Sequence, residues 1–478
     1  MNKQQIKLII GIVGLVTILN ACGIPKVTSR DANREVPEQF VNGNQDSTNI
    51  ADIIWKDYFH DKYLIALIDT ALLYNQELNI TLQEINVYNN EILARKGEYL
   101  PFVDIGAGGG VEKVGRYTSQ GANDANTEIA PGKETPDPLG DVFVGAFATW
   151  EIDIWRKLRN SRDAAVNRYL ATVEGKNFMV TNLVAEVASS YYELLALDSQ
   201  LKLLQEYIKI QNNALKTVKI QKEAGESTEL AVKRFEAEVL KTQAKQFDIK
   251  QQIVETENKI NFLLGRYPQH IERSEQSFEA PITDSLMYGV PSQLLENRPD
   301  IKAAELEITA SKLDVKVAKA KFYPSLDITA GVGMQAFNPA YFIKAPESML
   351  YNLAGDLMAP VINRKAIKAE FLSANAEQLQ AVYDYEKTVL TAYIEVYNQL
   401  SNIDNLNQSY SLKNQEVTVL NQSIVYANGL FTSAKADYME VLITQRDALD
   451  ARFELIEYKL MQFNAMIHLY QALGGGWK

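Results

Sequence analysis

Hydrophobic and polar residues follow two different spacings in different segments of this chain. From residue 382 to residue 424, apolar side chains recur at alternating steps of three and four, with only Gln399 and Lys413 polar among them. A second run, over residues 439–470, is interrupted only by Arg446. A sustained spacing of about 3.5 residues is typical of a coiled-coil seam. The sequence therefore predicts two long helices in its last third, and a less regular run over residues 180–201 predicts another.

The distribution of proline supports these helices. No proline occurs between Pro138 and Pro268 or after Pro360. Because a proline inside a helix costs about 3 kcal/mol, long helices fit best in those two intervals.

Four segments have the other period, in which apolar and polar residues alternate. They cover residues 103–112, 148–154, 326–335 and 351–357, and an apolar start at Val142 precedes the second of them. A tilted strand of about 9 to 11 residues crosses a bilayer with one face toward lipid and the other toward water. A half-buried soluble sheet alternates in the same way, so both interpretations stay open here. We interpret the glycine-rich stretch 106–110 as a strand face whose small residues leave a lumen free.

The two halves of the chain repeat each other. Residues 99–108 align with 322–331, residues 151–159 align with 360–368, and residues 225–232 fall opposite 434–441. Such a duplication of helix, hairpin, helix and helix predicts two copies of one structural unit.

The N-terminus has the features of a lipoprotein signal. Lys3 and Lys7 precede an apolar stretch over residues 8–16 that is too short to span a bilayer. The sequence then reads Leu19-Asn20-Ala21-Cys22-Gly23, which resembles the bacterial lipobox, and Cys22 is the only cysteine. We therefore expect cleavage after residue 21 and acylation of Cys22, with acyl chains that hold the mature chain to a membrane. Residues 22–45 lack a clear period, and we expect an extended arm there.

Composition narrows the chemistry. The formal charge of -12 argues against nucleic acid as a partner, because phosphate-binding surfaces are built from clustered lysine and arginine. His60, His270 and His468 are the only histidines, and none has a second histidine at metal-ligand spacing. No catalytic constellation is visible. We expect neither an enzyme nor a cofactor or metal site.

Four spanning strands cannot stand alone in a bilayer. An open sheet leaves N–H and C=O groups at its edges unsatisfied, at several kcal/mol each. The barrel must therefore close between chains, and a trimer with twelve strands leaves room for a lumen, whereas a dimer with eight does not.

Three motifs resemble a known family. The segment 294–305, with Arg298, Pro299 and Asp300 at its centre, resembles the hallmark of TolC-like outer membrane efflux proteins, in particular the lipoprotein branch that serves RND-type pumps. Residues 318–326 resemble the family's entry to the third strand, and residues 150–155 its exit from the second. The resemblance covers the chain from about residue 50 to its end.

The resemblance implies a mixed α/β membrane channel. It implies a homotrimer with a twelve-stranded outer membrane β-barrel, a long periplasmic α-helical barrel and a small equatorial domain. It also implies three partners, namely a periplasmic adaptor protein, an inner membrane RND-type pump and outer membrane lipid. The expected function is a passive conduit for small molecules in a tripartite efflux system. A type I protein secretion conduit and a periplasmic coiled-coil scaffold lipoprotein remain the alternatives.

With this family in view, we expect six parts of the chain. They are a signal peptide (1–21), a lipidated arm with an equatorial segment (22–60), a first repeat (61–268) with a hairpin at 102–154, a linker with an equatorial segment (269–299), a second repeat (300–472) with a hairpin at 325–360, and a tail (473–478).

The turns between the long helices carry the candidate functional residues. We expect Gly225, Glu226 and Glu229 at the first tip and Ala434 at the second to contact the adaptor. The family usually has glycine at both tips, so Ala434 is a departure. Asp437 and Glu440 follow the second turn, and threefold symmetry would place each in an acidic ring. Because such rings favour cations and close like charges repel, we expect these two residues to line a periplasmic gate.

Overall fold

The structure is a computed structural model, and it describes residues 23–28, 30–40, 48–279, 287–433 and 435–478. In chain order the elements are η1 (Ile50–Asp52), α2 (Trp55–Tyr58), α3 (Lys62–Tyr74), α4 (Gln76–Glu98), β1 (Phe102–Glu112), α5 (Ser119–Asp124), β2 (Glu128–Ala130), β3 (Lys133–Glu134), β4 (Leu139–Ile152), α6 (Lys157–Glu223), α7 (Glu229–Leu263), α8 (Glu275–Glu279), α9 (Gln293–Asn297), α10 (Pro299–Ala320), β5 (Ser325–Ala336), η2 (Pro339–Tyr341), β6 (Met349–Met358), α11 (Lys365–Thr432) and α12 (Tyr438–Ala472). The four predicted alternating segments lie in β1, β4, β5 and β6, and the long helices occupy the two intervals without proline.

The chain divides into two compact units. Unit 1 combines the described residues up to 31 with residues 87–169 and 306–382, and unit 2 combines residues 32–86, 170–305 and 383–478. Within the part of the chain that the structure describes, no helix has the length and apolar character needed to cross a membrane.

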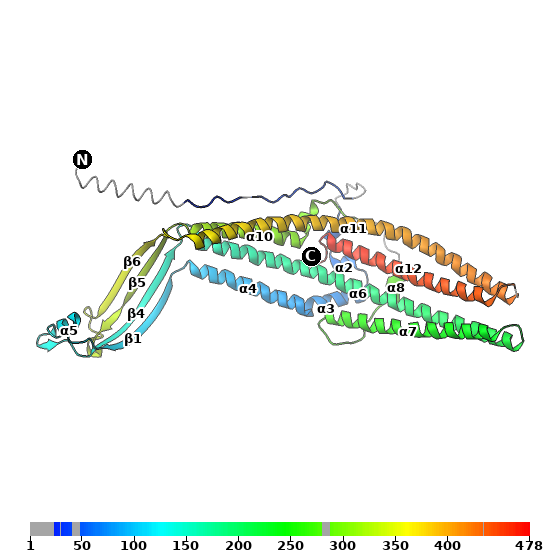
Figure 1. Cartoon of the computed structure of the whole chain (residues 1–478), viewed down its shortest axis with the longest axis horizontal. Coiled ribbons are helices and arrows are strands. Elements are labelled where there is room, and N and C mark those ends of the chain that lie inside the picture. Colours follow the sequence, from blue (N-terminus) through cyan, green and yellow to red (C-terminus); the bar gives the residue numbers. More distant parts are fainter. Residues whose placement is uncertain (1–22, 29, 41–47, 280–286, 434) are drawn as a thin grey trace. The chain divides into compact units, whose positions relative to one another are not determined.

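Unit 1 is built on a four-stranded antiparallel sheet with the order β1-β4-β5-β6 (Figure 1). The central pair β4 and β5 joins the two halves of the chain, while β1 and β6 each pair with a single strand within the described residues. In the middle of the sheet Gly145 lies opposite Gly106 on one side and Gly333 on the other. The 113–138 connection, which carries α5, β2 and β3, has no counterpart in our sequence prediction.

The end of β4 differs from the prediction. Alternation predicts a strand up to residue 154, but β4 ends at Ile152. The next residue, Asp153, is buried and its carboxylate accepts hydrogen bonds from the backbone N–H groups of Leu158 (3.0 Å) and Arg159 (2.9 Å). The first N–H groups of a helix have no partner within the helix, so this side chain caps α6 and draws the chain out of the sheet.

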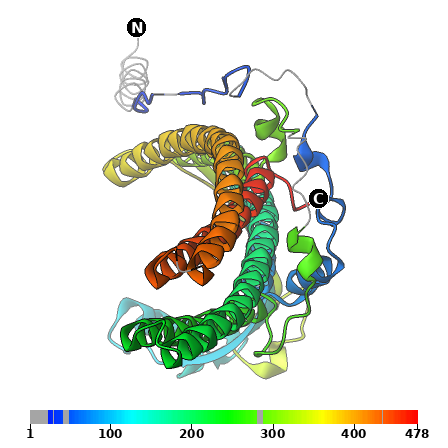
Figure 2. The same ribbon diagram turned by 90° about the vertical axis from the view of Figure 1, so that its right-hand side faces the viewer.

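Unit 2 contains two long antiparallel helix pairs, one formed by α6 and α7 and one by α11 and α12 (Figure 2). The predicted seam is buried in α11, for example at Ala392, Val396 and Ile403. Polar Lys413 is kept in the seam by ion pairs with Glu416 (2.6 Å) and with Glu454 of α12 (2.5 Å).

One position of the second seam is wrong. The prediction runs the α12 seam through Arg446, but this side chain is exposed, and its guanidinium pairs with the adjacent Asp447 (3.0 Å). The preceding Gln445 is buried instead. A straight helix has 3.6 residues per turn, so a strict 3.5-residue spacing drifts off the buried face unless the helices supercoil.

The core of unit 2 joins the two helix pairs. Tyr207 of α6 is buried with side chains of α7 and α12, in a cluster made of Leu197, Leu203, Leu204, Tyr207, Ile249, Leu449 and Phe453. Near the turns, Phe431, Tyr438 and Leu442 pack against a second cluster made of Val218, Ala231, Val232 and Phe235. The two turns therefore lie close together.

The described part of the N-terminal arm contains no helix or strand. In unit 1, Ile24 and Val27 pack against Phe322 and Phe371. In unit 2, Phe40 stacks on Tyr393 of α11 at a centroid distance of 5.5 Å.

Candidate functional site

The two faces of the sheet differ in chemistry. One face is apolar and well exposed, with Ile105 86%, Leu353 78% and Tyr351 83% exposed. The opposite face, here called the polar face, carries the six carboxylates of the four strands, which are Asp104, Glu112, Asp141, Glu151, Asp327 and Asp356. These four strands contain no lysine or arginine. All charged side chains of the four strands on the polar face are therefore acidic.

Two aromatic rings of β4 also lie on the polar face, and sequence reasoning missed them. Phe143 and Phe147 of β4 point to the same side as Asp141, because side chains two apart on a strand share a face. Their ring centroids are 6.5 Å apart and the ring planes meet at 76°. The sequence indicates their face only through their positions two and six residues after Asp141. The apolar residues at the start of β4 obscure this alternation. Gly106 and Gly108 of β1 thus lie beside aromatic side chains, whereas a Cβ at Gly110 would meet nothing within 4 Å.

The first tip has the geometry of a glycine-terminated helix. Gly225 has a φ of +80°, its N–H bonds to the Lys222 carbonyl (3.0 Å), and the Glu226 N–H bonds to the Gln221 carbonyl (2.8 Å). This is the Schellman arrangement, in which glycine takes the left-handed conformation. Glu229 begins α7 and pairs with Lys222 at 2.5 Å, and the hydrogen bond and charge of that lysine lower the pKa of Glu229.

At the second tip the same bond forms, from the Lys435 N–H to the Leu430 carbonyl (2.9 Å). Ala434 lies outside the described residues. Asp437 is the residue that precedes α12, but its side chain makes no capping hydrogen bond, although aspartate is a preferred residue there. Asp437 and Glu440 are both exposed. Their gating role stays a prediction.

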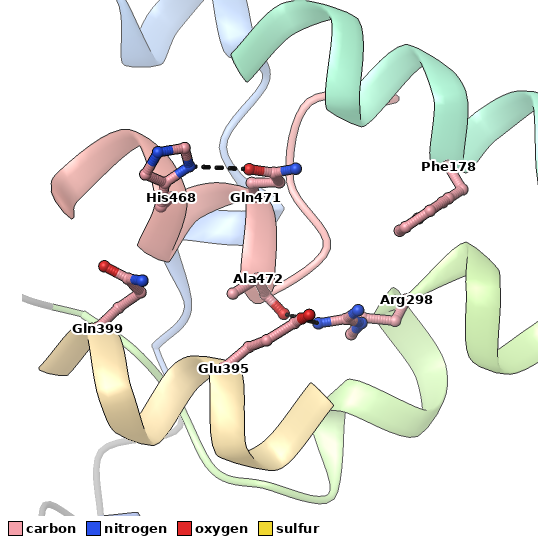
Figure 3. Close-up of a pocket in the computed structure, with 7 residues that line it drawn as sticks. All are labelled: Phe178, Arg298, Glu395, Gln399, His468, Gln471 and Ala472. Carbon is pink, nitrogen blue, oxygen red and sulfur yellow. Dashed lines mark hydrogen bonds and ion pairs between the residues drawn. The ribbon is translucent and has the colours of Figure 1, made fainter. Parts of the chain in front are cut away.

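The Arg298, Pro299 and Asp300 motif forms a buried junction in unit 2. The Arg298 side chain is 5% exposed, and Asp300 accepts hydrogen bonds from its Nε (3.0 Å) and Nη2 (2.7 Å). The Nη1 of Arg298 donates to Glu395 Oε2 of α11 (2.6 Å) and to the Ala472 carbonyl (2.9 Å) at the C-terminal end of α12 (Figure 3). Burial opposes the charge, but Asp300 and Glu395 outweigh it and raise the pKa of Arg298. The motif therefore joins three helices.

A small pocket borders this junction. Figure 3 shows His468 and Gln471 of α12 across from Gln399 of α11 and Phe178 of α6, with His468 Nδ1 3.1 Å from Gln471 Oε1. Among the described residues, no group of three or more His, Cys, Asp or Glu side chains is arranged to hold a metal ion. Cys22, the expected lipidation site, lies outside the described residues.

Comparisons with known proteins agree with this architecture. The chain is 26% identical to the pyoverdine export outer membrane protein OpmQ of Pseudomonas aeruginosa over 98% of this chain and 97% of that protein. It is 25% identical to the cation efflux system protein CusC of Escherichia coli over 96% and 97% of the two chains. The open-state structure of the Neisseria gonorrhoeae MtrE outer membrane channel matches its fold with a TM-score of 0.82 at 23% identity, covering 96% of this chain and 99% of that one.

A family model gives the assignment. The model described as outer membrane efflux protein matches residues 67–266 and 290–475, which together make up most of the chain. The residues matched include the sheet of unit 1, both long helix pairs and the Arg298 motif. The chain therefore belongs to the outer membrane efflux protein family and is the outer membrane channel of an efflux system.

Proposed function

We propose that three copies of this chain form a conduit for small molecules, in which their sheets close one twelve-stranded barrel in the outer membrane. The long helices form a helical barrel on the periplasmic side. A periplasmic adaptor and an inner membrane RND-type pump supply the substrate, and the pump supplies the energy. The observation that carries this proposal is a sheet with one exposed apolar face, one acidic face and two open edges.

The apolar face has the composition of a lipid contact. Its exposed side chains are Val103, Ile105, Val111, Val144, Val332, Met349, Tyr351, Leu353 and Leu357. Leaving such surface in water costs about 25 cal/mol per Å², so a membrane is a suitable environment for it. Two exposed tryptophans lie where the strands meet the helices, and their Nε1 groups donate to the carbonyls of Tyr99 (Trp150, 3.0 Å) and Pro324 (Trp155, 2.8 Å). Tryptophan is enriched at this level of a bilayer.

The open edges require other copies of the chain. Strands β1 and β6 each present one unpaired edge, and lipid offers no hydrogen-bond partner for it. Pairing β6 of one copy with β1 of the next closes the barrel, and three copies give a lumen that two copies do not. Exposed apolar residues at spacings of seven support further contacts between copies, for example Leu240, Phe247 and Val254 on α7.

The two duplicated halves and the N-terminal anchor complete the proposal. Residues 61–268 and 300–472 each contain one hairpin and one long helix pair in the same order, which supports a duplication. Acylation of Cys22 would attach each copy to the membrane, with the arm packed on Phe322 and on Phe371 and Tyr393 of α11.

The tips are the proposed adaptor contacts and the proposed gate. Gly225, Glu226 and Glu229 and the turn at Ala434 form the adaptor surface. Asp437 and Glu440 form acidic rings that constrict the periplasmic mouth to a small cation-selective opening, which widens when the adaptor binds. The exposure of both carboxylates and the missing cap at Asp437 support this role, because neither side chain is committed to a structural bond in the described tip.

The oligomeric mass and bilayer conductance of the purified chain test whether it forms a conduit. The chain, expressed with its own signal and extracted from outer membranes in detergent, should have the mass of a trimer and give discrete ohmic pores in planar bilayers. A monomer that stays in solution without detergent and does not conduct would overturn the proposal and favour a periplasmic scaffold.

The gate needs a separate comparison. Asp437→Ala combined with Glu440→Ala should raise the conductance and reduce the preference for cations, because the acidic rings are removed. The matched control is Glu226→Ala at the first tip, which should leave both properties unchanged. An unchanged conductance and cation preference in the double variant would place the gate elsewhere.

A further inference from the structure

Phe143 and Phe147 are two of the three aromatic side chains on the polar face of the four strands, and the third, Phe102, begins β1. They are four residues apart on β4, with Gly145 between them on the same face. Aromatic residues on a water-facing barrel surface need a reason, because burying them on the opposite face would be favourable.

Glycine makes room for both rings. Gly145 lies in a row with Gly106 and Gly333, so that the floor between the two rings is bare backbone. A Cβ at Gly108 would be 2.4 Å from Phe143 Cε1, and a Cβ at Gly331 would be 3.0 Å from Phe147 Cδ1. The rings therefore lean over the neighbouring strands β1 and β5 and do not stand upright into the space above the sheet.

Carboxylates surround the rings. Asp104 is directly opposite Phe147 on β1. Asp141 precedes Phe143 by two residues on the same face, and the Gln335 Nε2 donates to both of its carboxylate oxygens (2.9 and 3.0 Å). With no lysine or arginine in the four strands, no basic side chain of the sheet offsets these charges.

We propose that Phe143 and Phe147, together with Asp104 and Asp141, form a binding site for organic cations that carry aromatic or alkyl groups. The inference rests on the proposed function, because it requires the polar face to line the lumen. The ring faces attract a cation and its apolar substituents, and the carboxylates select positive charge. A small anion or a neutral sugar gains neither contribution.

The rings also have a structural alternative, in which they only cover glycines across the strand pair. The two roles differ in what they need from the side chain. Covering a glycine needs apolar bulk, which leucine supplies, whereas attracting a cation needs the face of an aromatic ring.

The test is the block of K⁺ current through the purified trimer in planar bilayers by tetraphenylphosphonium. The comparison uses the parent, a Phe143→Leu and Phe147→Leu double variant, and a Phe143→Tyr and Phe147→Tyr double variant. We expect the leucine variant to need about tenfold more cation for half block, because each half-buried ring strengthens cation binding by about two- to fivefold. The tyrosine variant should stay within about twofold of the parent. Tetraphenylborate, an anion of the same shape, should block the parent far less.

Oligomeric mass and K⁺ conductance report whether each variant assembles. If the leucine double variant does not assemble, the two single leucine variants replace it, each with an expected change of about threefold. Equal block of the parent and the leucine variants refutes the proposed cation-binding site, and so does equal block by the cation and the anion. A parent trimer that conducts no K⁺ refutes the conduit itself, which separates the two failures.

Discussion

Replacing Arg298 by methionine tests the buried junction at the end of α12. Methionine keeps much of the length of the side chain but removes the guanidinium. Four hydrogen bonds are lost, two to Asp300, one to Glu395 and one to the Ala472 carbonyl. The last four carbonyls of a helix have no partner within it, so the end of α12 loses a donor and a positive charge near its negative dipole end.

The magnitude follows from the exposure of the partners. Removing one member of a buried ion pair costs about 3 to 5 kcal/mol. Glu395 is 46% exposed, so water replaces its bond at little cost, whereas Asp300 is only 18% exposed and stays poorly solvated. We therefore expect the lower end of the range, about 3 kcal/mol, which is roughly a hundredfold in the opening equilibrium.

Hydrogen exchange followed by mass spectrometry measures this opening. The N–H groups of Leu473, Gly474 and Gly475 are bonded to carbonyls of the last turns of α12. In Arg298→Met they should exchange about a hundredfold faster than in the parent, while amides at the first tip keep their rates. The matched control is Glu395→Gln, which removes only a half-exposed partner and should change exchange less than about fivefold. Equal protection in Arg298→Met and the parent would refute the junction, as would equal effects of the two substitutions.

Three further predictions concern single side chains. Burial and the hydrogen bond to Asp61 raise the pKa of Tyr191, so its contribution to stability is present below about pH 10 and is lost as the pH rises through the folded pKa. Tyr191→Phe should lower the thermal midpoint at pH 7 and make it less sensitive to pH above 10. Gly225→Ala should cost about 1 to 2 kcal/mol, seen as faster exchange at the first tip, because φ is +80° there. Asp153→Ala should cost about 1 to 2 kcal/mol through the lost cap of α6, measured as a lower thermal midpoint of the purified protein.

Two of these predictions have a control variant in the same chain. Gly175→Ala lies within α6, where a Cβ meets nothing within 4 Å, and should not destabilise. Asp153→Asn keeps a side-chain oxygen and should lose much less than Asp153→Ala. An unchanged pH dependence in Tyr191→Phe would show that Tyr191 does not ionise on unfolding in this range.

Local sequence patterns determined the long helices, the four strands and the repeat of this chain. The 3.5-residue and two-residue periods identified the long helices and the four strands, because residues close in sequence determine which face of a helix or strand is apolar. The repeat of these patterns indicated two similar halves. The alternation in β5, from Leu326 to Met334, also fixed which face of that strand is apolar.

Tertiary structure alone decided the contacts between distant segments. That Arg298 meets Glu395, 97 residues away, and Ala472, 174 residues away, follows from how α10, α11 and α12 pack and from no local pattern. That Phe143 and Phe147 lie over glycines of β1 and β5 follows from the register between strands, in which a shift of one residue would turn either strand over. Periodicity shows which face a side chain is on, but only the packed chain shows what that side chain meets.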